Sequence, residues 1–346
     1  MSNAEKKGRK KNTAATAVFI VTAILLVIGI VLAVCIGKYP VTPGESLRIL
    51  WAKLFGLETG SDLMTENVVM RLRIPRILAS VLVGAALAVS GAAYQGIFKN
   101  PLVSPDFLGV SGGACIGAAA AILFSLSTAF VSFFAFIGGI VAVVLTVTIP
   151  AFLRNRSNIM LVLSGIIISS VMSSILGFIK YVADPDTQLA SITYWTMGSF
   201  QYIELGEILT LLPLILIPMA ILILMSWWID VLSMGEDEAR ALGANVRLVR
   251  GIAIACSTLL TAGSVCIAGT ISWIGLIIPH FGRMVVGPSN RKLIPASALL
   301  GGLFMLLVDT LTRTIATTEM PVSIMTGVIG APVFCWLLFM QKDDAI

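Results

Sequence analysis

AVFIVTAILLVIGIVLAVCI, residues 17–36, carries no charged side chain and is long enough to cross a membrane as a helix. About 20 residues at 1.5 Å each span the hydrocarbon core of a bilayer. The basic segment EKKGRKK, residues 5–11, comes shortly before it, a pattern typical of an uncleaved first helix with a cytoplasmic amino terminus. We therefore predict a membrane protein in which residues 1–16 form a basic cytoplasmic tail.

The composition of the whole chain agrees with this start. Of the 346 residues, 58% are hydrophobic and only 12% are charged, whereas about 25% are charged in an average soluble domain. The five cysteines lie in apolar runs without the close spacing of a zinc or redox motif, so we interpret them as packing residues. These features exclude a soluble globule and a disulfide scaffold, and we expect no metal site in this chain.

Nine further apolar runs bring the predicted number of membrane spans to ten. They lie at residues 75–97, 107–127, 130–152, 159–180, 206–228, 250–269, 272–286, 293–312 and 323–340. Ten spans return the carboxyl terminus to the cytoplasm, and in this topology 15 of the 23 Lys and Arg residues lie inside and 8 outside. We expect an all-α polytopic bundle that forms a single membrane domain over residues 1–346.

Small residues recur every four positions in two of these runs. They are Gly84, Ala88, Ala92 and Gly96 in one run and Gly109, Gly113 and Gly117 in the next. Such stripes let helix backbones approach closely inside a membrane, so we predict a compact bundle.

Three connections are longer than the others. In this topology residues 37–74 and 181–205 lie outside, and residues 229–249 lie inside. TPGE at 42–45 is a capping box with proline at the first helical position. The apolar residues that then recur on one helical face are Leu47, Leu50, Trp51, Leu54 and Phe55. We predict a short helix on the outer membrane interface, with a structural rather than a ligand-binding role.

The ionisable residues do not indicate ion coupling. None lies at the centre of a predicted span, where a proton- or sodium-driven transporter takes up its coupling ion. His280 lies toward the cytoplasmic end of the eighth span, and we interpret it as a structural hydrogen-bonding residue. The chain also lacks a Walker A motif, so energy for uphill transport would come from a partner.

The inner connection contains the sequence GEDEARALG, residues 235–243. Acidic residues at its start suit the positive end of a helix, and a glycine at its end suits a helix cap. Such a short helix between two spans can act as a rigid lever on which a partner docks. Composition alone leaves a merely solvated loop equally open.

Motifs spread along nearly the whole chain resemble those of a known family. They are RIPR at 73–76, GAALAVSG at 84–91, NPLV at 100–103, LGVSGG at 108–113, residues 235–243, GLIIPH at 275–280, Arg283, Asp309, Pro321 and GAP at 330–332. The chain closely resembles the permease subunits of FecCD-type (type II) ATP-binding-cassette importers for iron–siderophore complexes, haem and cobalamin.

This resemblance implies a subunit of a larger machine in the cytoplasmic (inner) membrane of a prokaryote. Two permeases, identical or related, surround a central path and work by alternating access. Two cytosolic ATPase subunits bind ATP and Mg, and a solute-binding protein delivers the substrate outside. This chain would then hold no cofactor, contact no nucleic acid and need no catalytic residue, because the solute does not react.

The resemblance also assigns roles to residues. Coupling to the ATPase falls to Gly235, Glu236, Asp237, Glu238, Ala239, Arg240, Leu242 and Gly243. Docking of the binding protein falls to Arg73, Arg76 and Arg313, which we expect to be exposed and to pair with its glutamates. Interfacial anchoring is the alternative role for these arginines.

The stretch before the sixth span resembles that of siderophore-type permeases. Its candidate outer-path residues are Tyr194, Trp195, Met197 and Phe200, whose side chains suit a large, partly apolar chelate. We favour a ferric siderophore over haem or cobalamin as the substrate. A secondary transporter would need a midplane carboxylate and an intramembrane enzyme a polar cluster near a span end, and the sequence favours neither.

Overall fold

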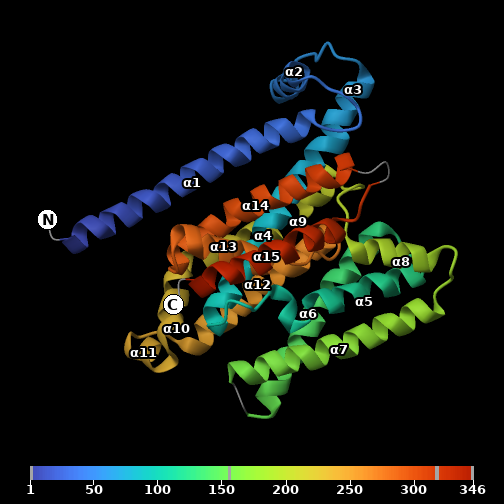
Figure 1. Cartoon of the computed structure of the whole chain (residues 1–346). Helices are drawn as coiled ribbons and strands as arrows, with labels where there is room; N and C mark the ends of the chain where they lie inside the picture. Colours follow the sequence, from blue (N-terminus) through green and yellow to red (C-terminus); the bar gives the residue numbers. More distant parts are fainter. Residues whose placement is uncertain (1–2, 155–156, 316–318, 344–346) are drawn as a thin grey trace.

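The computed structural model describes residues 3–154, 157–315 and 319–343, and within them the regular structure is helical (Figure 1). The elements are α1 (Asn3–Cys35), α2 (Pro43–Leu54), α3 (Leu63–Asn67), the π-helix η1 (Val68–Arg73), α4 (Ile74–Phe98), the 3-10 turn η2 (Pro105–Leu108), α5 (Val110–Leu123), α6 (Thr128–Phe152), α7 (Asn158–Val182), α8 (Gln188–Met197), α9 (Leu205–Leu224), α10 (Ser226–Met234), α11 (Glu236–Ala241), α12 (Val246–Ala268), α13 (Ile274–Val286), α14 (Asn290–Ile315) and α15 (Val322–Asp343).

Each of the ten predicted apolar runs contains a helix. Eight helices of the described residues are long and apolar enough to cross a membrane. The two remaining runs form the shorter apolar helices α5 and α13. The prediction of an all-α polytopic membrane bundle is therefore confirmed.

Helix α4 lies at the centre of the bundle, and its small residues explain how. A Cβ added to Gly84 would lie 2.3 Å from the carbonyl oxygen of Gly301 on α14. A Cβ added to Gly91 would lie 1.9 Å from the carbonyl oxygen of Gly275 on α13. Real side chains cannot come so close to backbone atoms, so these glycines set the distance between the helices. Gly84 belongs to the predicted stripe, whose role in close packing is confirmed at this residue, and Gly91 adds a second close approach outside the stripe.

The predicted outer connection contains more helix than expected. Thr42 accepts a hydrogen bond from the Glu45 amide at 3.3 Å and begins α2, as the capping pattern predicts. Residues 63–73 form α3 and η1, which run directly into α4 as one continuous helical segment. Val68 and Val69 are buried there, and this apolar contact makes the continuation favourable.

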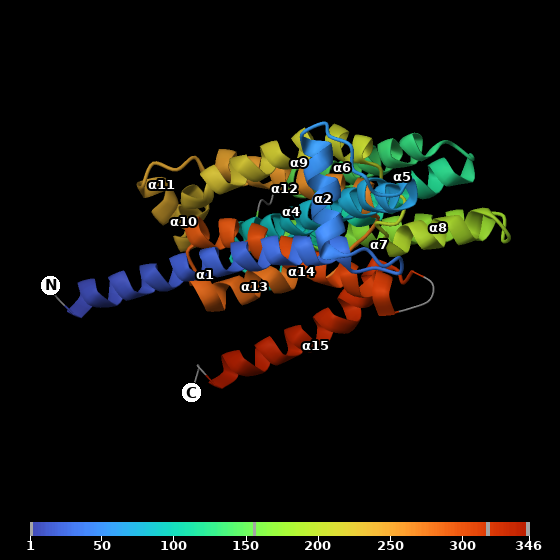
Figure 2. The same cartoon turned by 90° about the horizontal axis from the view of Figure 1, so that it is seen from above.

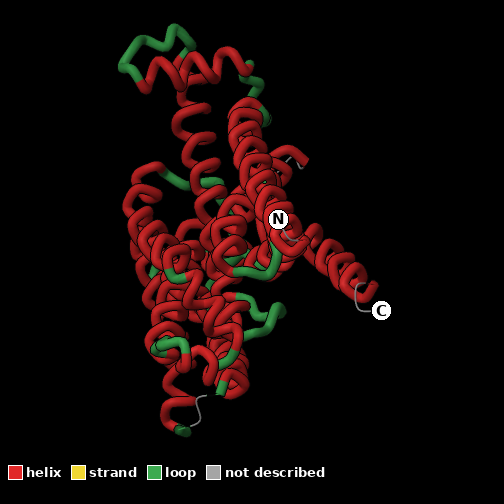
Figure 3. The backbone as a smooth tube through the Cα atoms, turned by 90° about the vertical axis from the view of Figure 1, so that its left-hand side faces the viewer, coloured by secondary structure: helices red, strands yellow, loops and turns green. Residues whose placement is uncertain are grey.

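The face of α2 that packs on the protein is not its predicted apolar stripe. Ser46, Ile49 and Ala52 are buried, whereas Trp51 and Leu54 are exposed. In Figure 3, α2 lies at the upper edge, outside the outline of the other helices. Its apolar face therefore points away from the bundle, as the predicted interfacial helix would place it.

The two ends of the bundle carry different elements (Figure 1). Helices α10 and α11 lie at the same end as the amino terminus of α1 and the last residues of α15, and we call this the α11 end. Elements α2, α3 and α8 lie toward the other end, which we call the α2 end. Figure 2 shows α15 at the edge of the bundle, diverging from α13 and α14.

Candidate functional site: a short helix at one end and buried arginines at the other

The segment between α10 and α12 forms the predicted short helix. Gly235 begins it, and a Cβ at that position would lie 1.7 Å from a carboxylate oxygen of Glu238. At the other end Gly243 has φ +84°, and the amide of Ala244 donates to the carbonyl of Ala239 at 2.9 Å. Left-handed glycine after a last helical turn is a common helix end. The helix and its glycine end at Gly243 agree with the sequence pattern.

Helix α11 has one side held by the protein and one side free. Glu236 pairs with Arg250 of α12 at 2.5 Å, and Ala239 is fully buried. The side chains of Asp237, Arg240 and Leu242 are exposed. Helix α11 therefore presents polar and apolar groups outward while its inner side is fastened to α12.

The ion pair also affects the titration of Glu236. The hydrogen bond from Arg250 is the main reason why the pKa of Glu236 lies below its ordinary value, although burial acts in the opposite direction. Arg240 adds a weaker contact to the same carboxylate at 3.4 Å. Arg250 is absent from the predicted site because it lies beyond the short helix, on the following span.

A second polar contact joins this region to α14. Asp230 of α10 accepts hydrogen bonds from the amide of Asn290 at 2.6 Å and from the hydroxyl of Ser289 at 2.8 Å. It thereby satisfies free amides at the start of α14. Asp230 is absent from the predicted site, because a partner about 60 residues away leaves no local pattern. Helices α10 and α11 are thus joined by polar contacts to both α12 and α14.

The three arginines at the α2 end are buried, so the expectation that they are exposed is wrong. Arg73, Arg76 and Arg313 are 5%, 7% and 6% exposed. Arg73 donates to the carbonyls of Val34 at 2.5 Å and Cys35 at 3.0 Å. Arg313 donates to the carbonyl of Ala33 at 2.5 Å.

These carbonyls belong to the last turn of α1. The final carbonyls of a helix lack partners within it and carry its negative end, so cations there are favourable. Arg73 and Arg313 therefore fasten the end of α1 to the bundle, which explains why both are turned inward rather than outward.

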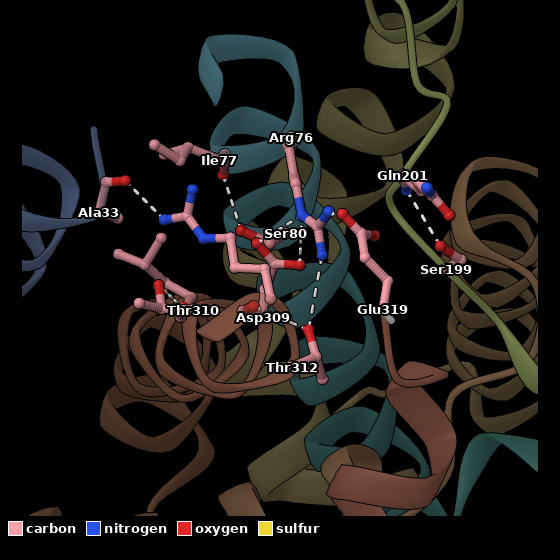
Figure 4. A network of polar contacts seen from close by, with 12 residues as sticks. Ala33, Arg76, Ile77, Ser80, Ser199, Gln201, Asp309, Thr310, Thr312 and Glu319 are labelled. Atoms are coloured by element: carbon pink, nitrogen blue, oxygen red, sulfur yellow. Dashed lines mark hydrogen bonds and ion pairs between the residues drawn. The ribbon is translucent and has the colours of Figure 1, made fainter. Parts of the chain in front are cut away.

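Arg76 lies between two carboxylates (Figure 4). Its Nε donates to Asp309 of α14 at 2.8 Å, and its Nη1 donates to Glu319 at 2.7 Å. Nη2 is 3.5 Å from the hydroxyl of Thr312. Asp309 is fully buried, whereas the side chain of Glu319 is 24% exposed. Glu319 is absent from the predicted site, because it lies 243 residues from Arg76 along the chain and shares no local pattern with it.

The predicted outer-path residues do not share one environment. Tyr194 is exposed, and Trp195 and Met197 are partly exposed, all on α8. Phe200 is fully buried in the main core, so its predicted place on an outer path is wrong in this conformation. The reason is local: the amide of Ser199 donates to the carbonyl of Ala268 at 2.9 Å, which turns the chain inward after α8.

His280 departs from its predicted role. It is buried on α13, and neither ring nitrogen has a hydrogen-bond partner within the described residues. Its ring instead lies edge-on to Phe334 of α15, with the centroids 5.8 Å apart. The prediction of a hydrogen-bonding histidine is therefore wrong in this conformation.

Comparison with known proteins identifies relatives over almost the full length. A family model described as the FecCD transport family matches residues 25–340. The molybdate import system permease protein of Haemophilus influenzae is 40% identical over 92% of this chain and 94% of its own length. The hemin transport system permease protein of Yersinia pestis is 35% identical over 86% of this chain and 89% of its own length.

A solved structure has the same fold. It is an inward-facing metal-chelate type ABC transporter, with 35% sequence identity and a TM-score of 0.83 over 94% of this chain and 99% of that chain. A second, PsaBC from Streptococcus pneumoniae, has 17% identity and a TM-score of 0.54 over 76% of this chain and 89% of that chain, which shows likeness of fold alone.

Proposed function

This chain belongs to the FecCD transport family as an ABC importer permease, and we propose that it carries a metal chelate, with a ferric siderophore as the substrate. The permease is a multi-pass inner-membrane protein. It is a transport component and not itself an enzyme. An ATPase and a solute-binding protein are its expected partners. A second permease, either a copy of this chain or a related one, would complete the path.

The observation that carries the coupling role is the fastening of α11. Its inner side is tied to α12 through Glu236 and Arg250, and its neighbour α10 is tied to α14 through Asp230. The outward groups of α11 would seat on the ATPase, and the predicted coupling residues 235–243 all belong to this unit. Motion imposed on α11 would then reach two spans rather than end in a flexible loop.

The same role sets the orientation in the membrane. We place the α11 end in the cytoplasm, where the ATPase lies, and the α2 end outside. The basic residues at 5–11 then lie on the cytoplasmic side, in accordance with the distribution of positive charge expected in membrane proteins. Both ends of the described chain lie at the α11 end, so both termini are cytoplasmic in this proposal.

The substrate choice rests on the surface of α8. Tyr194, Trp195 and Met197 offer aromatic and thioether groups toward the α2 end, which suit a large and partly apolar chelate. A relative from Helicobacter pylori, 38% identical over 80% of this chain, is named a probable iron chelatin transport permease. Haem and cobalamin stay alternatives, since relatives named for each match as well.

Molybdate is a second candidate, because the relative named for it is 40% identical over 92% of this chain. A small oxyanion is bound mainly by hydrogen-bond donors and cations. Arg73 and Arg313 are buried and already donate to backbone carbonyls of α1. This arrangement favours the chelate over the bare anion.

An uptake experiment decides between them. The permease, its ATPase and its binding protein are reconstituted in proteoliposomes, and uptake of ⁵⁵Fe-siderophore and of ⁹⁹Mo-molybdate is measured with and without ATP. We expect ATP-dependent uptake of the ferric chelate. Uptake of molybdate alone would replace the proposed substrate, and uptake without ATP would contradict the importer mechanism.

A further inference from the structure

The two carboxylates that hold Arg76 differ in exposure. Asp309 has no exposed surface and binds Nε. Glu319 binds Nη1 and keeps 24% of its side chain exposed. A carboxylate arriving from outside would therefore meet Glu319 first, and it could take over Nη1 without disturbing the buried pair.

Glu319 also lies where its ion pair joins the start of α15 to the rest of the bundle. It precedes α15 by three residues, and α15 contacts chiefly α8, α13 and α14. Its ion pair with Arg76 ties the start of α15 directly to α4, the central helix of the bundle. The next polar tie is the amide of Val322, which donates to the carbonyl of Gly198 at 3.0 Å. Figure 2 shows α15 diverging from the bundle beyond this point.

We propose that Glu319 is an internal carboxylate ligand of Arg76 that latches α15 to α4, and that an acidic side chain of the docked solute-binding protein displaces it. This inference rests on the proposed function. In this proposal Arg76 exchanges one carboxylate for another. Its Nη1 is occupied by Glu319 until a carboxylate of the solute-binding protein takes that place. Docking would then release the start of α15, which links delivery to opening.

The donors of Arg76 favour exchange over simple addition. Nε and Nη1 already bind Asp309 and Glu319, and Nη2 faces the hydroxyl of Thr312 at 3.5 Å, so a third carboxylate would find no vacant pair of donors. Displacement of Glu319 keeps the number of carboxylates at two, and the released Glu319 returns to water because it is already partly exposed. The planar set of N–H donors of arginine can donate to a new carboxylate in the same geometry.

The test measures docking on the complete transporter in lipid nanodiscs, using the solute-binding protein that co-purifies with it. Glu319→Gln keeps the shape of the side chain and removes its charge. The apparent affinity is lowered to the fraction of sites that an internal competitor leaves free, so we expect Glu319→Gln to tighten docking by about fivefold. Glu58→Gln removes an exposed carboxylate elsewhere at the α2 end and should leave the affinity unchanged.

Hydrogen–deuterium exchange supplies the second readout. Exchange in residues 319–324 should be faster in Glu319→Gln, and it should become equally fast in the unaltered protein when the binding protein docks. A purely structural role for Glu319 would speed exchange without tightening docking, and that result would overturn the proposal. Slower or unchanged exchange on docking would overturn it as well.

Failure of the proposed function and failure of the latch give different results. If the unaltered transporter binds no solute-binding protein, the proposed function itself fails. If Glu319→Gln does not assemble, Glu319→Asp keeps the charge but shortens the reach to Nη1. It should tighten docking by less than fivefold, and equal or weaker docking than in the unaltered transporter would refute the latch.

Discussion

Removal of the Arg250 side chain should uncouple ATP hydrolysis from transport. Arg250 holds the inner side of α11 through its 2.5 Å pair with Glu236, so Arg250→Ala leaves α11 attached to α12 mainly through the chain. Glu236 is 42% exposed, and water can solvate its carboxylate once the arginine is gone. We therefore expect the protein to fold and to reach the membrane normally.

The size of the effect follows from the same exposure. A pair in which one member is this exposed contributes about 1 kcal/mol at most, because water screens the charges. That energy corresponds to about a fivefold change in the balance between a fastened and a loosened α11. The number of solutes moved per ATP hydrolysed should fall by about two- to fivefold, while ATP hydrolysis itself continues.

The assay measures ATP hydrolysis and solute uptake in the same proteoliposomes. Arg247→Ala is the matched control, since Arg247 is an exposed arginine of the same helix without an ion pair in the described residues. Its ratio of uptake to hydrolysis should equal that of the unaltered protein. If Arg250→Ala also keeps the normal ratio, the fastening of α11 has no part in coupling and the reasoning is wrong.

Three other predictions test separate parts of the account. Glu236→Ala combined with Arg240→Ala should lower uptake while the amount of folded protein in the membrane stays the same; normal uptake would count against the lever. The pKa of Glu236 is lowered, so its ion pair with Arg250 is fully formed above the ordinary glutamate pKa and is lost only as the pH falls through the lowered value. The ratio of uptake to ATP hydrolysis should therefore be constant from about pH 6 to pH 8. Gly91→Ala should destabilise the protein by about 3 kcal/mol in thermal unfolding, whereas Gly177→Ala, with open space around it, should be close to neutral.

Local patterns predicted the elements well. The apolar runs, the stripe that contains Gly84 and Gly96 and the glycine end of α11 at Gly243 depend on residues that are neighbours along the chain or repeat at helical spacing. Hydrophobic burial in lipid and helix capping depend on residues close together in the chain, so local sequence patterns predict them directly. The continuation of α4 into residues 63–73 was missed because this segment contains Glu66, Arg71 and Arg73 and so does not read as part of an apolar run.

The site was predicted less completely, and the reason is the range of its contacts. The resemblance assigns Arg73 and Arg313 to docking and predicts that they are exposed, whereas both are buried against backbone carbonyls at the end of α1, contacts that no side-chain pattern reveals. Arg76 meets Asp309 only after α4 and α14 pack together. Phe200 was placed on the outer path by the family resemblance and its aromatic character, whereas it is buried beside the backbone hydrogen bond from the Ser199 amide to the Ala268 carbonyl.

The most direct test of the central claim is the composition of the complex that contains this chain. The protein is purified from its native membrane in mild detergent, and native mass spectrometry gives the mass and stoichiometry of what accompanies it. We predict two permease subunits with two ATPase subunits, joined through the α11 end. A stable complex without any ATPase, under conditions that preserve known ABC importers, would contradict the account.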